Sequence, residues 1–194
     1  MAEVHPIVEK ALKCIDEIYP SENTLNEGYF PTDAFIDEAV HWVIDIVPSH
    51  ELSTRVDLPL STSQGNDEGG SATVSGVGRI VYCSGQKWKR PVLGVITEND
   101  PLYIQQKNKV LRGNASRPIV ALVEGRTKLE WWPSVGEGAP TVKHVPYAID
   151  NIPASLYDIT AWKLAEIVLM SMHDTQGASI CTSKVNEHLE ILAL

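Results

Sequence analysis

The chain has 194 residues, of which 43% are hydrophobic and 21% charged, and its formal net charge is −9. This size and composition fit a globular chain that builds its own core without disulfides, and no apolar run approaches the roughly 18–20 residues of a membrane span. The three cysteines lack CxxC spacing, so we expect neither a disulfide framework nor a zinc site. The first residues lack the basic and apolar regions of a signal peptide, which predicts that there is none.

Charge is distributed unevenly along the chain. Residues 1–78 carry 14 acidic and three basic side chains, residues 79–128 carry three acidic and 10 basic, and residues 129–194 carry eight acidic and three basic. The acidic balance of the whole disfavours general nucleic-acid binding, because duplex affinity depends on Lys and Arg. The basic centre fits three interpretations: contact with phosphate, contact with an acidic surface of another copy, or a solvated face without a partner.

Residues 1–50 are predicted to form a helical hairpin. Apolar side chains recur at helical spacing over residues 4–19 and again over residues 35–47. Pro20 is expected to end the first helix, and Thr32 is a suitable N-cap for the second. The polar segment 21–31 between them is expected to be a loop.

Residues 51–150 are predicted to be a β-rich centre. Its first feature is segment 61–71, which has no large apolar residue and is expected to be a flexible surface loop. Asp100, or its neighbour Asn99, is expected to cap a short helix over 100–110 that has Pro101 at its first position. Runs rich in β-branched and aromatic residues predict antiparallel strands, with a hairpin turn at 124–126. The expected strands are residues 77–83, 88–97, 119–124, 128–132 and 142–148.

Residues 151–194 are predicted to be helical. A long helix opens at Pro153 and continues to Met172, and it is apolar nearly all round from residue 164 onward. Such a helix is buried on more than one side, either by a subunit interface or by the chain's own core. Gly177 is expected to end it, and a shorter final helix is expected over 180–192. The whole pattern predicts a single α+β domain, 1–194.

Enzyme signatures are absent from the sequence: it has no GxSxG, HExxH or P-loop motif. His41 and Asp45 lie four residues apart on a predicted helix and could hold a metal or orient a base. A structural pair is the favoured interpretation, because no third ligand is evident. We therefore predict no catalytic, cofactor or metal residue, and an unrecognised hydrolase remains an alternative.

The most distinctive cluster is the basic segment 86–92. Lys87, Lys89 and Arg90 surround Trp88 just before an apolar run. This composition suits contact with phosphate, stacking on a base, or an anchor in a protein interface. An exposed basic strand edge is the plainer alternative. The candidate interface residues are Lys87, Trp88, Lys89, Arg90, Arg112 and Arg117, and the same set would serve a nucleic-acid-binding module.

The cluster also belongs to a longer pattern of motifs. A strand, Arg79-Ile80-Val81-Tyr82-Cys83-Ser84, leads to Trp88-Lys89-Arg90-Pro91-Val92. The pattern continues with Ile96-Thr97, Pro101-Leu102-Tyr103, Gln105-Gln106, Arg112-Gly113-Asn114, Arg117-Pro118-Ile119-Val120, Ile152-Pro153 and Leu156-Tyr157. This pattern covers residues 79–172, about half of the chain, and it resembles the head–tail connector (ring) proteins of crAss-like tailed phages. Segment 61–71 looks like an insertion relative to that family.

The resemblance implies a structural role without catalysis. Connector proteins assemble about a dozen copies into a ring between the portal of the capsid and the tail, where neighbouring surfaces differ. The expected partners are further copies of the chain, the portal protein, and other connector or tail proteins, with no membrane. DNA would pass through the lumen without specific binding. The expected location is the portal–tail junction of the virion, after synthesis in the host cytoplasm.

Overall fold

A computed structural model of the chain describes residues 4–19, 32–66 and 68–192; the predicted loop 21–31 lies outside these residues. The chain divides into two compact units, which we name by their content. The helical unit is formed by Met1–Thr54 and Tyr147–Leu194, and the β unit by Arg55–Pro146. The α+β class is therefore confirmed, and within the predicted range 1–194 the β unit is inserted between the two segments that form the helical unit.

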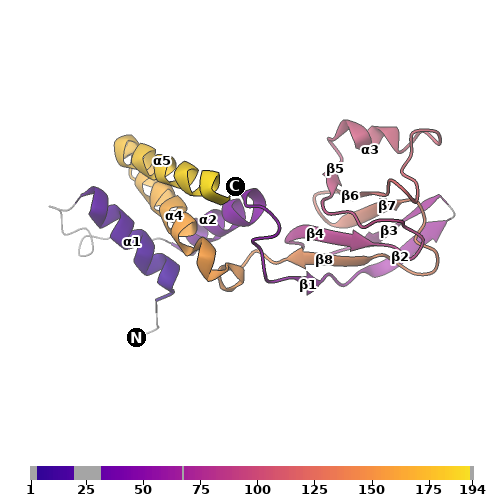
Figure 1. Ribbon diagram of the computed structural model, residues 1–194, viewed down its shortest axis with the longest axis horizontal. Coiled ribbons are helices and arrows are strands. Elements are labelled where there is room, and N and C mark those ends of the chain that lie inside the picture. Colours follow the sequence, from indigo (N-terminus) through magenta and orange to yellow (C-terminus); the bar gives the residue numbers. More distant parts are fainter. Residues whose placement is uncertain (1–3, 20–31, 67, 193–194) are drawn as a thin grey trace. The chain divides into compact units, whose positions relative to one another are not determined.

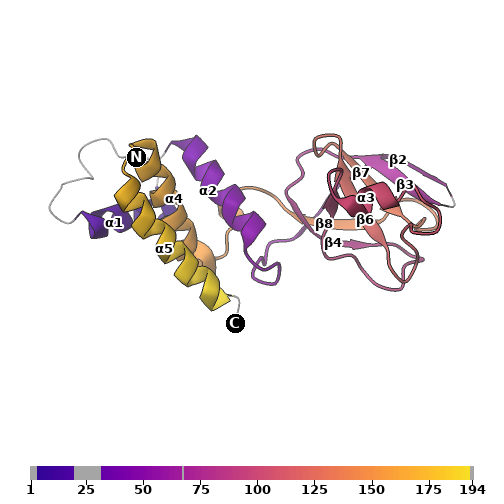
Figure 2. The same cartoon turned by 90° about the horizontal axis from the view of Figure 1, so that it is seen from above.

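The helical unit is organised around α4 (Figures 1 and 2). Its helices are α1 (Pro6–Ile18), α2 (Asp33–Ile46), α4 (Tyr157–Ser171) and α5 (Thr175–Leu192). The predicted hairpin of the first two helices is wrong, because α1 and α2 each pack against α4 rather than chiefly against one another. An apolar stripe on each of them needs a partner, and the apolar surface of α4 provides it.

The burial of α4 is supplied by the chain itself. Helices α1, α2 and α5 all contact it, and Leu164, Ala165 and Leu169 are fully or almost fully buried. Thr160, the polar exception, donates from Oγ1 to the carbonyl of Leu156 at 2.7 Å. Of the two explanations for an all-round apolar helix, the chain's own core is therefore the correct one. Among the described helices, none combines the length and apolar character needed to cross a bilayer.

Gly177 does not end a helix, contrary to the prediction; it lies in the first turn of α5. The chain reverses at His173, whose φ is +64°, and Asp174 then accepts hydrogen bonds from the Gly177 N–H at 2.9 Å and the Tyr19 hydroxyl at 2.5 Å. A Cβ at Gly177 would lie 2.5 Å from Asp174 Oδ2. The glycine therefore permits a close approach, and α5, at 18 residues, is longer than the expected final helix.

The β unit contains two sheets (Figure 1). One has the order β1-β8-β4 and is antiparallel; the other has the order β2-β3-β7-β6-β5, in which only the β5–β6 pair is parallel. The strands are β1 (Val56–Asp57), β2 (Ser61–Asn66), β3 (Gly69–Thr73), β4 (Arg79–Ser84), β5 (Ile96–Thr97), β6 (Ile119–Val123), β7 (Lys128–Trp132) and β8 (Thr141–Val145). The predicted turn at 124–126 joins β6 to β7 with three successive positive φ angles.

The two sheets share one hydrophobic core. Strand β6 is buried along nearly its whole length, whereas β7 alternates between buried and half-buried residues, as a strand with one solvated face does. The short helix α3 (Pro101–Gln105) begins where predicted, with Asp100 as its N-cap. The large core residues include Leu58, Ile80, Trp88, Val120, Leu122, Leu129 and Trp131.

Segment 61–71 is not a flexible loop, contrary to the prediction. Apart from residue 67, which is not described, it belongs to the β2–β3 hairpin, and β3 pairs with β7. Close packing requires a glycine at position 69: a Cβ there would overlap with the Trp131 carbonyl oxygen and lie 2.8 Å from Trp132 Cδ1. Tertiary packing here supports a hairpin whose own side chains carry no strand signal.

The predicted strand over 88–97 is also wrong for most of its length. Trp88 lies in a turn after β4, Val92 forms an isolated bridge with Cys83, and only Ile96–Thr97 forms strand β5. Pro91 cannot donate to a ladder, and the Leu93 side chain is exposed. The apolar composition of this segment therefore reflects one buried indole and several loop residues.

Candidate functional site

The six predicted interface residues differ in how far they are buried. Lys87, Lys89 and Arg90 are exposed, but Trp88 is only 9% exposed and belongs to the core of the β unit. Its indole Nε1–H donates to the Pro133 carbonyl at 3.1 Å. An indole held in this way cannot stack on a base or anchor a partner. The Trp88 part of the predicted interface is therefore wrong.

The two arginines of the predicted set also differ. Arg117 is exposed, in a tight turn in which its backbone exchanges hydrogen bonds with Asn114. Arg112 is enclosed: its Nη1 contacts Glu68 Oε2 at 2.5 Å, and its Nε donates to the Gln106 carbonyl at 2.8 Å. The structure brings Arg112 and Lys87 to one cavity of the β unit.

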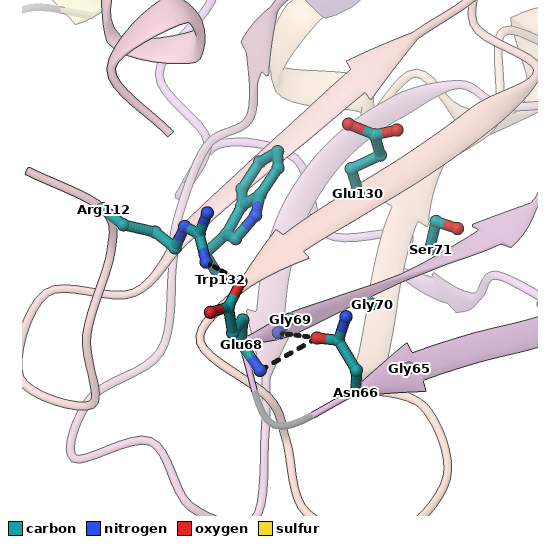
Figure 3. A pocket seen from close by; sticks show the side chains of 9 residues that line it. All are labelled: Gly65, Asn66, Glu68, Gly69, Gly70, Ser71, Arg112, Glu130 and Trp132. Atoms are coloured by element: carbon teal, nitrogen blue, oxygen red, sulfur yellow. Dashed lines mark hydrogen bonds and ion pairs between the residues drawn. The ribbon is translucent and has the colours of Figure 1, made fainter. Parts of the chain in front are cut away.

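Glu68 is the centre of this site, and the sequence analysis did not identify it. Its Oε1 lies 2.8 Å from Lys109 Nζ, and its Oε2 contacts Arg112 (Figure 3). Hydrogen bonds from Lys109 and then from Arg112 lower the pKa of Glu68 from its ordinary 4.5 to about 2. The group is therefore a permanent carboxylate at neutral pH. It cannot act as a general acid there.

The hairpin tip presents Glu68 to these cations. Asn66 Oδ1 accepts hydrogen bonds from the backbone N–H groups of Glu68, at 2.9 Å, and Gly69, at 3.0 Å. An Asx turn of this kind fixes a short reversal. Glu68 itself remains 46% exposed, so the ion pair lies at the mouth of the site rather than in the core.

Arg112 is positioned by a buried glutamine. Gln106, which is 2% exposed, donates from Nε2 to the Leu102 carbonyl at 2.6 Å and accepts from the Gly113 N–H at 2.8 Å. Through these two bonds, Gln106 links helix α3 to Gly113 at the far end of the segment that follows the helix. The Gln106 carbonyl then holds the Arg112 side chain. The guanidinium is consequently pre-organised before any partner arrives.

Two cavities meet at the Glu68–Arg112 pair. The first has a volume of about 490 Å³ and is lined by Glu68, Glu130, Trp132 and the backbone of the β2–β3 hairpin (Figure 3). A second carboxylate in the lining, Glu130, forms an ion pair with Lys128 Nζ at 2.9 Å and accepts a hydrogen bond from the Tyr103 hydroxyl at 2.9 Å. Both carboxylates of this cavity are therefore paired with cations, which does not favour acid–base chemistry.

The second cavity has a volume of about 470 Å³ and a different charge balance. Lys87, Lys109 and Arg112 line it, Glu68 is the only carboxylate among the described residues of its lining, and Val110, Asn114 and Ser134 are also part of the wall. Three cations against one anion favour a negatively charged ligand. Lys109 stands three residues before Arg112 in the sequence and could have been grouped with it. Glu68 is 44 residues away and gave no local signal.

His41 and Asp45 both interact with Tyr147 within the helical unit. The His41 ring lies 4.1 Å from the Tyr147 ring, and Asp45 Oδ1 accepts from the Tyr147 hydroxyl at 2.6 Å. Both residues thus hold Tyr147 against α2. In the described ranges of the chain, no three His, Cys, Asp or Glu side chains are grouped so that they could hold a metal.

Burial disfavours the thiolate form of all three cysteines. Burial raises the pKa of Cys14, Cys83 and Cys181 to about 12 in each case. Because the thiolate is the nucleophile, none of them is activated.

Comparison with known proteins does not assign the chain to a family. No family model matches the chain, and no curated protein matches it.

Proposed function

We propose that the chain is a structural subunit of a phage head–tail connector, in which copies form a ring between the portal and the tail. The proposal starts from the motifs of residues 79–172, which resemble those connector proteins. In this role the chain contributes surfaces and a channel wall. Its partners are further copies, the portal protein and other connector or tail proteins.

The observation that carries the proposal is the opposite charge of the two units. The helical unit has 17 acidic and four basic residues, a formal net charge of −13, whereas the β unit has eight acidic and 12 basic residues, a net charge of +4. In a ring, each copy presents one surface to the copy before it and a different surface to the copy after it. Opposite charges on the two surfaces favour a contact between different surfaces of neighbouring copies. They disfavour a contact between two copies of the same surface.

Exposed apolar side chains on both units support the same arrangement. The helical unit exposes Met170, Met172 and Ile180, and the β unit exposes Val110 and Leu111. Apolar groups close to charges are typical of the core and rim of protein interfaces. The burial of α4 contributes nothing to this argument, because the chain's own helices account for it.

Nucleic-acid binding is less well supported than it was from the sequence. Its stacking residue, Trp88, is in the core, and Arg112 is engaged by Glu68. Lys87, Lys89 and Arg90 could still contact phosphate. A helical unit with a charge of −13 repels DNA, which suits a channel through which DNA passes without being held.

Mass spectrometry of phage particles tests the proposal. Nuclease-treated, purified particles would be analysed with isotope-labelled peptides of this chain and of the major capsid protein. We expect about a dozen copies per particle, as for other connector rings. An abundant host ribosomal protein serves as the control for carried-over material. Copy numbers at the level of that control would contradict the proposal.

A further inference from the structure

The cavity beside Glu68 has more positive charge than the described chain neutralises. Lys87, Lys109 and Arg112 line it, and among the lining residues that the structure describes Glu68 is the only carboxylate. Lys109 and Arg112 both bond to Glu68, whereas Lys87 forms no ion pair with any described residue. An unpaired lysine at the wall of a cavity attracts a second anion.

Glu68 shows which kind of anion these cations accept. Its two carboxylate oxygens each take one cation, at 2.8 Å for Lys109 and 2.5 Å for Arg112. A guanidinium has five N–H donors in a planar fork, and the bonds to Glu68 and to Gln106 engage Arg112 through Nη1 and Nε. Because the bonds to described residues use Nη1 and Nε, a second carboxylate can share Arg112 with Glu68 through Nη2.

Two exposed aliphatic residues, Val110 and Leu111, form an apolar part of the rim of the cavity. Val110, which lines the cavity, is 89% exposed, and its neighbour Leu111 is 56% exposed. Arg112 is largely enclosed, and an enclosed cation beside exposed aliphatic side chains is typical of a protein-docking surface rather than of a phosphate site. The buried Gln106 keeps the arginine in place, which reduces the entropy lost on docking.

The charge of the helical unit identifies the occupant. With a net charge of −13, it is the acidic surface that the chain itself supplies, and it exposes Met170, Met172 and Ile180 for contact with an apolar rim. We propose that the cavity lined by Lys87, Lys109 and Arg112 receives an Asp or Glu side chain from the helical unit of a neighbouring copy. This inference rests on the proposed ring and names the contact that closes it.

Photo-crosslinking in assembled particles tests the inference. The full chain carrying p-benzoylphenylalanine at Val110 would be produced in infected cells, and the purified particles would be irradiated. We expect a band at twice the 21.3 kDa monomer mass, joined between residue 110 and a peptide from 1–54 or 147–194. The matched control carries the same group at Leu93, which is also exposed, at 66%, and is not among the residues lining the cavity. It should not join to those peptides.

Each other outcome is decisive. A crosslink from residue 110 to a different virion protein, or to DNA, overturns the inference and leaves the chain as a virion component. An uncrosslinked chain that is present in the particles also overturns it, because the rim would then face solvent. Absence of the chain from the particles, measured in the same sample, is the separate failure of the proposed function.

Charge reversal separates this contact from general electrostatics. Lys87→Glu should lower the yield of the residue-110 dimer about tenfold, because a desolvated carboxylate would then face a like charge. Lys143→Glu makes the same change in net charge on strand β8, and Lys143 does not line this cavity. An equal loss in both variants would mean that net charge alone drives association, and would overturn the assignment of the cavity.

Discussion

Gln106 offers the sharpest test of whether the Arg112 site is a built feature of the β unit. Its buried side chain bonds to the Leu102 carbonyl and to the Gly113 N–H. Gln106→Ala leaves the buried Gly113 N–H without its acceptor, at a cost of about 2 kcal/mol. Loss of the bond to Leu102 adds about 1 kcal/mol. We therefore expect the free energy of unfolding of the β unit to fall by about 3 kcal/mol.

The assay is amide hydrogen exchange of the full chain followed by mass spectrometry, with urea denaturation as the global measurement. Faster exchange should be greatest in peptides covering 106–119, next to the broken bonds. Gln105→Ala is the matched control, because this neighbouring glutamine is exposed, and it should change stability by less than about 0.5 kcal/mol. If the two variants behave alike, Gln106 does not organise the segment and the claim of a pre-organised arginine is refuted.

Three further predictions concern the core of the β unit. Trp88→Ala should destabilise it by about 3–5 kcal/mol, because the indole is buried and bonded to Pro133. His144 is neutral in the fold, where its Nδ1 accepts from the Gly78 N–H at 3.0 Å, and burial lowers its pKa below 6.5. Its contribution is therefore complete above pH 6.5 and declines as the pH falls below that value, which thermal unfolding at pH 7.5 and 5.5 will measure. Gly78→Ala should cost about 3 kcal/mol or more, because its Cβ would overlap with the Val145 carbonyl oxygen, which belongs to the backbone of β8 and cannot easily move away.

Controls for these predictions come from neighbouring positions. Lys89→Ala removes an exposed side chain beside Trp88 and should leave stability unchanged; a comparable loss would contradict burial of the indole as the cause. Gly94→Ala places its Cβ in open space, so a large loss there would show that glycine flexibility, not the close approach at Gly78, matters. His144→Gln should flatten the dependence on pH, and an unchanged slope would assign it to another group.

The helices were predictable because their signal is local. Apolar spacing in α1 and α2, and the apolar surface of α4, follow directly from the sequence. The same holds for the β6–β7 hairpin, whose turn residues lie between two apolar strands. How these helices pair was not predictable, because the same stripe can face any apolar neighbour. The fold resolves this by setting both α1 and α2 against α4.

The errors arose where tertiary contacts override local composition. In strand β3, Gly69 cannot be replaced by a larger residue because the Trp131 backbone carbonyl and the Trp132 side chain lie against it. Gly177 was predicted to end a helix. Its lack of a side chain instead leaves space for the Asp174 carboxylate. Gly69 is restricted by residues that are distant in sequence, whereas Gly177 is restricted by Asp174, three residues earlier, and by the Tyr19 hydroxyl. A glycine in the sequence does not by itself indicate such neighbours.

The candidate site was only partly predictable, for the same reason. Arg112 and Lys87 were identified as cations, but nothing local indicated that they share a cavity. Glu68 lies in a segment that looked like a loop, and its pairing with Lys109 and Arg112 depends on the hairpin tip. Trp88 looked like an interface anchor because aromatic and basic residues alternate there. The fold turns its indole inward and leaves only its neighbours exposed.

The central claim is that this chain forms the ring between portal and tail, and an electron cryo-microscopy reconstruction of the portal vertex tests it most directly. The account predicts ring density below the portal into which the helical unit and the β unit each fit, as separate bodies, once per subunit. It also predicts that the cavity of Lys87, Lys109 and Arg112 contacts the helical unit of the adjacent copy. A ring whose density fits neither unit would contradict the account.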